Sequence, residues 1–205
     1  MLERMLSAAL CGLIKTLTGA RALWHDAAPS SQARVYFANH RSHGDFVLIW
    51  AFLPPAQRAL TRPVAGADYW LSGGPRQYLI ERVFRGVLID RQIKRGDDPI
   101  AAMLAPLEAG ESLIVFPEGT RNQGDGVLPF KAGLHRLARA RPETEFVPVW
   151  IENLGRALPK GGLIPLPLLC SLTFGVPVTL RPGEARAGFL ARCRAALLDL
   201  DPSAQ

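Results

Sequence analysis

Short apolar runs alternate with segments of helical character along most of this chain, and this alternation is the feature that most constrains its fold. Each run has the length and composition of a buried strand, and the segments between them carry apolar residues at helical spacing. Strands are predicted at 34–38, 63–67, 86–90, 112–116, 146–151 and 171–175, and helices at 45–53, 74–84, 98–109, 130–141 and 185–199. The pattern predicts an α/β fold, a single mixed and mostly parallel sheet covered by helices.

A further, amphipathic helix is predicted at the N-terminus. Residues 1–24 place their polar side chains on a narrow stripe, and apolar side chains fill much of the remainder. The pattern fits two arrangements equally well. One is a helix lying on a membrane surface with Trp24 at the boundary, and the other is a helix packed on the domain core.

Composition narrows the choice of partners. The net charge is +6 at pH 7, and the mean hydropathy of +0.10 is high for a purely soluble protein of this size. Excess basic charge attracts nucleic acid, anionic lipid headgroups or phosphorylated small molecules. Aromatic residues make up only 8% of the chain and zinc-finger spacing is missing, which disfavours nucleic acid. The three cysteines form no CxxC pair and are predicted to be buried, reduced thiols.

The polar run 39–45 directly follows the strand predicted at 34–38 and contains His40 and Asp45. Residues five apart on a regular helix point about 140° away from each other, so this pair could not meet there. A turn at 42–44 would let the carboxylate bind one ring nitrogen of the histidine. The other nitrogen would then be a general base, with a nucleophile that the substrate must supply. A metal site that adds His43 is the weaker alternative, because no further His or Cys cluster completes it.

A second turn, at 116–121, follows the strand predicted at 112–116. Its Pro and Gly indicate a sharp turn that presents Glu118, Thr120 and Arg121 outward. An arginine there suits bidentate binding of a phosphate, to which backbone N–H groups near Gly119 would add. The simpler interpretation is a surface turn with a solvated arginine.

Two more cations are candidate anion ligands. Arg91 follows the strand predicted at 86–90, and Lys131 opens the helix predicted at 130–141. A lysine at a helix N-terminus is unfavourable with the helix dipole, and a bound anion nearby would remove that objection. Each has a simpler explanation as a solvated charge.

Four motif blocks in this order resemble the glycerolipid (lysophospholipid) acyltransferase family, which includes 1-acylglycerol-3-phosphate acyltransferases. They span over half of the chain. The blocks are Asn39-His40-x-Ser42-x-x-Asp45, Gly86-Val87-x-Ile89-Asp90-Arg91, Phe116-Pro117-Glu118-Gly119-Thr120-Arg121 and Val147-Pro148-Val149.

The resemblance implies roles by position. His40 matches the catalytic base and Asp45 the partner that stabilises its charge. Pro148 matches a block linked to the acyl donor or to packing beside it, and a proline inside a predicted strand also indicates an edge or an irregular position. The other two blocks are associated with the phosphate of the acceptor. The predicted acceptor-binding residues are Gly86, Arg91, Glu118, Gly119, Thr120, Arg121 and Lys131.

The resemblance implies transfer of an acyl group from acyl-CoA or acyl carrier protein to the free hydroxyl of a lysophospholipid, with 1-acylglycerol-3-phosphate favoured and phosphatidate as product. The thioester is a co-substrate, and neither a resident cofactor nor a metal is expected. Three alternatives stay open: another acceptor such as a lyso-ornithine lipid, an acyl-thioester hydrolase, and a lipid-binding protein without activity.

Domain organisation and location follow from the same resemblance. Residues 1–24 are predicted to form a membrane-interfacial helix and residues 25–205 the acyltransferase domain. The expected partners are a membrane surface and the lysophospholipid, with an acyl carrier protein as a further candidate. The expected location is peripheral, on the cytoplasmic face of a bacterial inner membrane.

Overall fold

The structure is a computed structural model that describes residues 2–25, 29–90, 98–122, 124, 126–153 and 170–204. Within these ranges the strands form one 7-stranded sheet in the order β1-β7-β6-β2-β5-β3-β4. The strands are β1 (Arg21–Trp24), β2 (Arg34–Ala38), β3 (Thr61–Gly66), β4 (Val87–Ile89), β5 (Ser112–Val115), β6 (Glu145–Glu152) and β7 (Ser171–Phe174). The helices are α1 (Leu2–Thr18), α2 (Asp45–Phe52), α3 (Pro55–Ala59), α4 (Ala67–Trp70), α5 (Pro75–Tyr78), the π-helical turn η1 (Leu79–Val83), α6 (Pro99–Glu108), α7 (Gly133–Ala140), α9 (Arg186–Leu198) and the 3₁₀ turn η2 (Pro202–Ala204).

The sheet is mixed and mostly parallel, as the sequence predicts. β2 pairs in parallel with β5 and β6, and β3 pairs in parallel with β4 and β5. β6 and β7 pair antiparallel, so β7 and its parallel neighbour β1 run opposite to the rest of the sheet. Each strand predicted from the sequence is present, within a residue or two of its predicted bounds.

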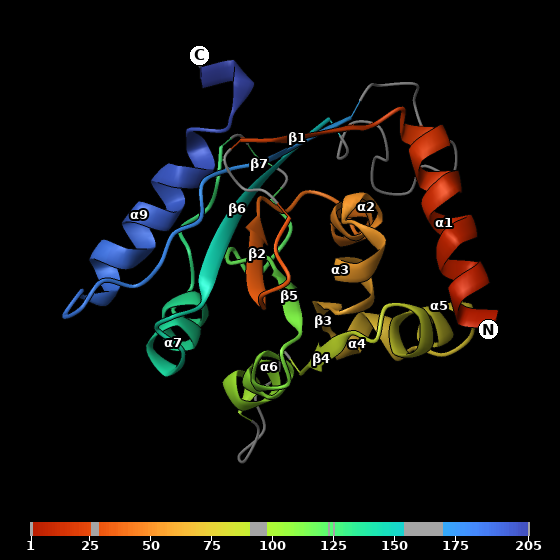
Figure 1. Ribbon diagram of the computed structural model, residues 1–205, viewed down its shortest axis with the longest axis horizontal. Helices are drawn as coiled ribbons and strands as arrows, with labels where there is room; N and C mark the ends of the chain where they lie inside the picture. The colour runs from red at the N-terminus through yellow and green to blue at the C-terminus, as the bar shows by residue number, and fades with distance from the viewer. Residues whose placement is uncertain are drawn as a thin grey trace.

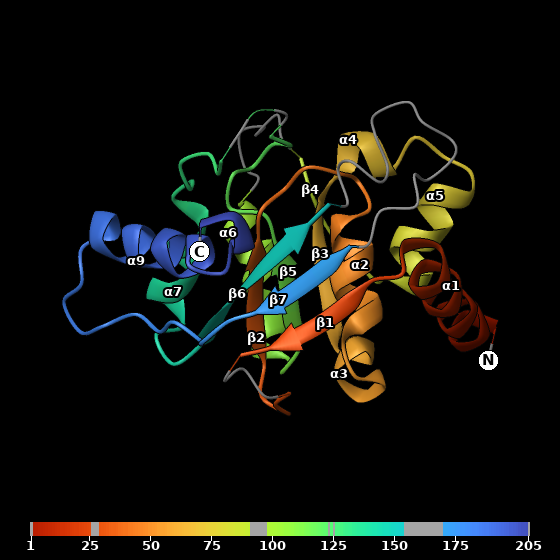
Figure 2. The ribbon, with the colours of Figure 1, turned by 90° about the horizontal axis from the view of Figure 1, so that it is seen from above.

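Helices cover both faces of the sheet (Figures 1 and 2). Tyr36 and Ala38 of β2 pack on the side of α1, α2 and η1, whereas Val35 and Phe37 pack on the side of α6, α7 and α9. Successive strand residues point to opposite faces, so a strand covered on both sides must be apolar throughout. This accounts for the unbroken burial of β2.

The N-terminal helix is shorter than the predicted span 1–24. α1 ends at Thr18, and Gly19, with φ of 55°, follows it in the left-handed conformation that commonly ends a helix. The next residues form β1 and extend the sheet beside β7. Trp24 stacks on Phe174 with ring centroids 3.8 Å apart, so it packs on the sheet and does not lie on the helix.

α1 packs one face against the core. Cys11 is buried there, and Leu6, Leu10 and Ile14 contact the same cluster. No helix in the described part of the chain is long and apolar enough to cross a bilayer.

Pro148 lies on an inner strand, so the prediction of an edge position is wrong and the alternative of an irregular position is correct. β6 pairs with β2 on one side and with β7 on the other. β7 ends at Phe174, and the next bridge to β6 joins Phe146 to Val178. Between these two points the N–H of Gly175 donates to the Pro148 carbonyl at 2.9 Å. The missing N–H of the proline therefore falls where the β6–β7 ladder is interrupted.

Candidate active site

The candidate site lies at the carboxyl edge of the parallel strands. β2, β3, β4 and β5 all end at this edge, where ligand sites of α/β sheets collect. The turn after β2 carries His40, and the turn after β5 carries Glu118 and Gly119. The fold thus brings the first and third sequence blocks together.

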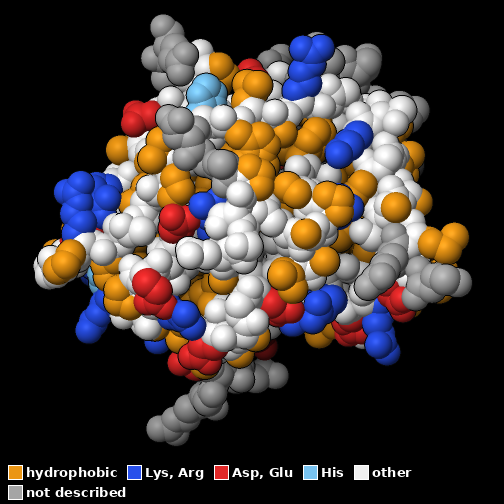
Figure 3. Space-filling view, in the orientation of Figure 1, with side chains coloured by type: hydrophobic (Ala, Val, Ile, Leu, Met, Phe, Trp, Pro, Cys, Tyr) orange, Lys and Arg blue, Asp and Glu red, His pale blue; other side chains and the backbone are white. Residues whose placement is uncertain are grey.

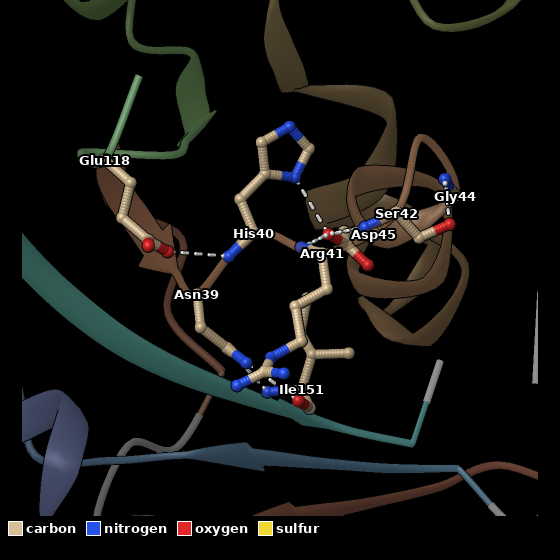
Figure 4. A network of polar contacts seen from close by, with 8 residues as sticks. All are labelled: Asn39, His40, Arg41, Ser42, Gly44, Asp45, Glu118 and Ile151. Carbon is tan, nitrogen blue, oxygen red and sulfur yellow. Dashed lines mark hydrogen bonds and ion pairs between the residues drawn. The ribbon is translucent and has the colours of Figure 1, made fainter. Parts of the chain in front are cut away.

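Asn39 fixes the start of the first turn. Its side-chain amide donates to the Ile151 carbonyl at 2.9 Å, and its carbonyl oxygen accepts the Ile151 N–H at 2.8 Å (Figure 4). The side chain thus continues the β2–β6 pairing one residue beyond the strand. This buried pair of bonds sets where the chain leaves the sheet, and therefore where His40 lies.

The turn folds back and brings Asp45 against His40, as the five-residue spacing predicts. Asp45 Oδ2 lies 2.8 Å from His40 Nδ1 and also accepts the N–H groups of Arg41 at 2.7 Å and Ser42 at 2.8 Å (Figure 4). Three donors converge on one oxygen, so the carboxylate is held in place by the turn that it closes.

The residues around His40 leave one nitrogen of its imidazole ring available to a substrate. The Asp45 side chain is 1% exposed and that of His40 is 15% exposed. The imidazole stacks on Phe116 with centroids 4.0 Å apart, which covers one face of the ring. Because Nδ1 faces Asp45, Nε2 is the nitrogen able to accept a proton from a group in the cavity.

Glu118 is buried, contrary to the outward orientation predicted from its turn. It is 3% exposed. Its Oε1 accepts the backbone N–H of His40 and its Oε2 accepts that of Leu128, both at 2.9 Å. The carboxylate thus ties the histidine turn to two segments that follow β5, an arrangement that sequence reasoning missed because both partners are distant backbone groups.

Thr120 is exposed and Arg121 is half-exposed, which agrees with the outward turn predicted for them. Neither lines the cavity described below. The next residue, Asn122, donates its N–H to the His40 carbonyl at 2.7 Å. The turn after β5 therefore holds the backbone of His40 on both of its polar groups.

The second sequence block is only partly described, because Arg91 lies outside the described residues. Gly86 does not line the cavity. Its N–H donates to the Ile80 carbonyl at 2.7 Å, and a Cβ built on it would lie 2.7 Å from Ile80 Cδ1. The glycine allows close packing of β4 on η1, and its described contacts give it no path to a ligand.

Pro148, from the fourth sequence block, is buried in the sheet and does not line the cavity, which supports its packing role.

A cavity of ≈ 370 Å³ opens beside His40. Its polar lining consists of His40, His43, Tyr69, Asp90 and Lys131. Most of the remaining wall is apolar and comes from both faces of the sheet: Phe46, Val64, Ala65, Trp70, Ile89, Pro99, Met103, Val115, Phe116, Pro117, Leu134 and Leu137. A mostly apolar cavity with a few polar groups at a histidine suits an amphiphilic ligand.

Residues 24–152 match the family of proteins described as Acyltransferase. The chain belongs to this family. Its similar relatives include 1-acyl-sn-glycerol-3-phosphate acyltransferase of Salmonella typhimurium, 32% identical over 127 residues that make up 58% of this chain and 46% of the relative. The alpha form of the same enzyme in Homo sapiens is 34% identical over 138 residues, 61% of this chain and 42% of the relative. The chain thus spans less than half the length of these relatives.

The fold is that of a solved acyltransferase. The crystal structure of the 1-acyl-sn-glycerophosphate (LPA) acyltransferase PlsC from Thermotoga maritima superposes with a TM-score of 0.77 at 20% sequence identity, covering 98% of this chain and 81% of that one. At this identity the likeness establishes the fold alone.

Two side chains beside the candidate site of this chain were missed or left unexplained by sequence reasoning. His43 stacks on Tyr69 with centroids 3.9 Å apart, and the guanidinium of Arg76 lies 4.6 Å from the centre of the same tyrosine ring. Tyr69 belongs to α4, a helix of 4 residues, which is too short to give a periodic sequence signal. The stack forms one wall of the cavity next to His40.

The three cysteines of this chain are free and buried, as predicted. Burial raises the pKa of the Cys170 thiol, and burial raises the pKa of Cys193 to about 12. A protonated thiol is a poor nucleophile. Within the described ranges, no group of three or more His, Cys, Asp or Glu residues could hold a metal ion.

Proposed function

We propose that this protein transfers an acyl group from an acyl thioester to the free hydroxyl of a lysophospholipid, with 1-acylglycerol-3-phosphate as the preferred acceptor and phosphatidate as the product. The observation that carries the proposal is the hydrogen bond between His40 and Asp45, together with the position of His40 in the wall of a mostly apolar cavity. The relatives that match more than half of this chain are 1-acyl-sn-glycerol-3-phosphate acyltransferases, and this similarity supports the proposed acceptor.

In the proposed reaction, His40 Nε2 takes the proton of the acceptor hydroxyl as its oxygen attacks the thioester carbon. Asp45 stabilises the imidazolium that forms. The tetrahedral intermediate then collapses: the carbon–sulfur bond breaks, the thiolate leaves, and the imidazolium returns a proton to sulfur. The products are the diacylated lipid and the free thiol, and no protein nucleophile takes part.

The phosphate of the acceptor is assigned to the basic side chains near the site. Lys131 lines the cavity, and Arg121 lies on the turn that binds the His40 backbone. Arg91, outside the described residues, keeps the role that the motif implies. Holding the phosphate places the hydroxyl against Nε2, and such positioning supplies much of an enzyme's rate. The apolar wall formed by Val64, Met103 and their neighbours is assigned to an acyl chain.

The membrane is the proposed source of the acceptor. α1 exposes Leu2, Met5, Leu13 and Leu17 on the face turned away from the core. Hydrophobic side chains project at the right edge of Figure 3, where Figure 1 places α1. A helix with one packed face and one exposed apolar face satisfies both arrangements predicted from the sequence, and it supports a peripheral location on a membrane. The cytoplasmic face remains our proposal from the family resemblance.

Charge placed on this face should release the protein from lipid. L13D and L17D replace side chains that are 55% and 51% exposed, so each variant should fold normally. Each should lower the partition of the protein onto anionic vesicles by about tenfold. This loss corresponds to part of the free energy gained by burying one leucine side chain in the membrane. V176D is the matched control, because Val176 is an apolar residue, 58% exposed, that lies outside α1. Vesicle sedimentation measures the effect. Equal binding by all four proteins would contradict the membrane role of α1.

Acyl transfer over a panel of acceptors tests the proposed function. Purified protein is mixed with acyl-CoA or acyl carrier protein thioester and with lysophosphatidate, a lyso-ornithine lipid or no acceptor, and both thiol and lipid are measured. We expect thiol release that requires lysophosphatidate and no acylated protein by mass spectrometry. Release without acceptor would indicate a hydrolase, and an acyl group trapped on Ser or Cys would contradict the direct transfer.

A further inference from the structure

Arg139 of α7 and Arg186 of α9 form a basic surface where these two helices pack together, which we name the α7–α9 surface. Both arginines are exposed. Between the helices lies the buried His135, and its pKa is lowered by burial and by the charges of these two arginines. The His135 ring lies 6.1 Å from that of Phe189 on α9. This packing holds two cations near each other that are far apart in the chain.

The charge of the α7–α9 surface is not neutralised by carboxylates of the protein. Within the described part of the chain, the side chains of Arg139 and Arg186 make no hydrogen bond or ion pair. Glu184 lies near His135 but binds Arg192 at 2.6 Å, and this guanidinium lowers the pKa of Glu184 to about 2. The acidic side chain nearest to the surface is therefore already paired.

Two further features add positive charge at the same place. Arg136 of α7 is 58% exposed and lies 3.7 Å from Asp98, which is 54% exposed, so solvent screens this ion pair. α9 begins at Arg186 with no acidic residue in its first turn, and the positive end of the helix dipole adds to the charge. Basic side chains lie along the left edge of Figure 3, where Figure 1 places α7 and α9.

The α7–α9 surface is close to the cavity but does not open into it. Leu134 and Leu137 of α7 line the cavity. Arg139 is two and five positions from them, which on a helix turns it about 140° to 160° away from both. A partner on this surface would thus lie about one helix diameter, about 10–12 Å, from the cavity wall.

The same surface lies far from the face that is proposed to meet lipid. α1 is at one end of the sheet, and α7 and α9 are at the other, in both views of the ribbon (Figures 1 and 2). A protein that rests on a membrane through α1 would therefore leave the α7–α9 surface accessible to a soluble partner.

We propose that the α7–α9 surface docks an acyl carrier protein, a small acidic protein that delivers the acyl thioester. The proposal rests on the proposed function, which requires a thioester donor. Complementary charge speeds and orients the association of an acidic protein with a basic surface. A carrier protein holds its thioester at the end of a long phosphopantetheine arm, which allows it to dock on one side of α7 and deliver the acyl group to the other.

Charge reversal tests the surface in an acyl-transfer assay, with lysophosphatidate carried in neutral detergent micelles. R139E/R186E should raise the KM for the acyl carrier protein thioester by about tenfold or more, because the attraction becomes a repulsion. The KM for acyl-CoA, the KM for lysophosphatidate and kcat should change little. R139Q/R186Q removes the charges without reversing them, so its effect should be in the same direction and smaller.

R21E/R82E is the matched control. Arg21 of β1 and Arg82 of η1 are exposed and lie outside the α7–α9 surface, and the double variant changes the net charge by the same amount. It should keep the wild-type KM for the carrier protein. An equal loss in this control would show an effect of net charge alone and overturn the docking surface. An equal rise in KM for acyl-CoA in R139E/R186E would overturn docking of a protein, because the surface would then bind phosphates that acyl-CoA also carries.

Direct binding separates this proposal from the proposed function. Fluorescently labelled holo-acyl carrier protein is titrated with the wild-type protein, R139E/R186E and R21E/R82E, and anisotropy is measured at low and high salt. We expect binding that added salt weakens and that R139E/R186E alone loses. That result in a protein without acyl-transfer activity would support the docking surface and contradict the proposed function. Transfer from acyl-CoA without any binding of the carrier protein would support the proposed function and overturn the docking surface.

Discussion

H40A is expected to lower the rate of acyl transfer by about 10²- to 10⁴-fold, the usual contribution of a general base. The variant removes the proton acceptor but leaves the groups assigned to the phosphate. The KM for lysophosphatidate should therefore change little. A loss of kcat at constant acceptor affinity is the signature of an interaction made only in the transition state.

The effect should be specific to this histidine. H25A is the matched control, because His25 is exposed and does not line the cavity. D45N should also lose activity, since an amide cannot stabilise the imidazolium as a carboxylate does. Initial rates under saturating donor, with the melting temperature of each variant, separate chemistry from folding. Near-normal transfer by H40A would contradict the assignment of the base.

Local sequence patterns predicted the parts of the site that depend on local geometry. The apolar run of β2 and the turn that follows it are sufficient to place Asp45 on His40, because the pair is separated by only five positions. The carboxyl edge of the sheet as the location of the site follows from the alternation of strands and helices. These inferences need no knowledge of which distant residues pack together.

The inferences that failed depend on contacts between distant segments. Glu118 binds the His40 N–H, a partner 78 positions away, so nothing in its own turn shows that it faces inward. Gly86 packs on nearby Ile80 and also against the Pro63 carbonyl of β3, and its own motif block does not show this second contact. Trp24 belongs to strand β1, and not to the predicted helix, because β1 pairs with β7, which lies far along the chain.

Glu118 is the residue for which burial changes the expected phenotype most. If it bound the acceptor directly, its removal would raise KM. As a buried acceptor for two backbone N–H groups, it should instead control the position of His40 and the stability of the fold. E118A leaves both donors unsatisfied, at a cost of about 1–3 kcal/mol each. For a chain of this size, that lowers the melting temperature by several degrees or more.

We expect E118A to lose at least about tenfold in kcat, because a displacement of the base by about 1 Å can cost a hundredfold in rate. The acceptor KM should change much less. E118Q keeps one acceptor oxygen, so its kcat and melting temperature should lie between those of E118A and the wild type. E108A is the matched control, because Glu108 is an exposed glutamate that does not line the cavity. Assays well below the lowest melting temperature isolate the catalytic effect. A rise in KM at constant kcat would show that Glu118 contacts the acceptor after all.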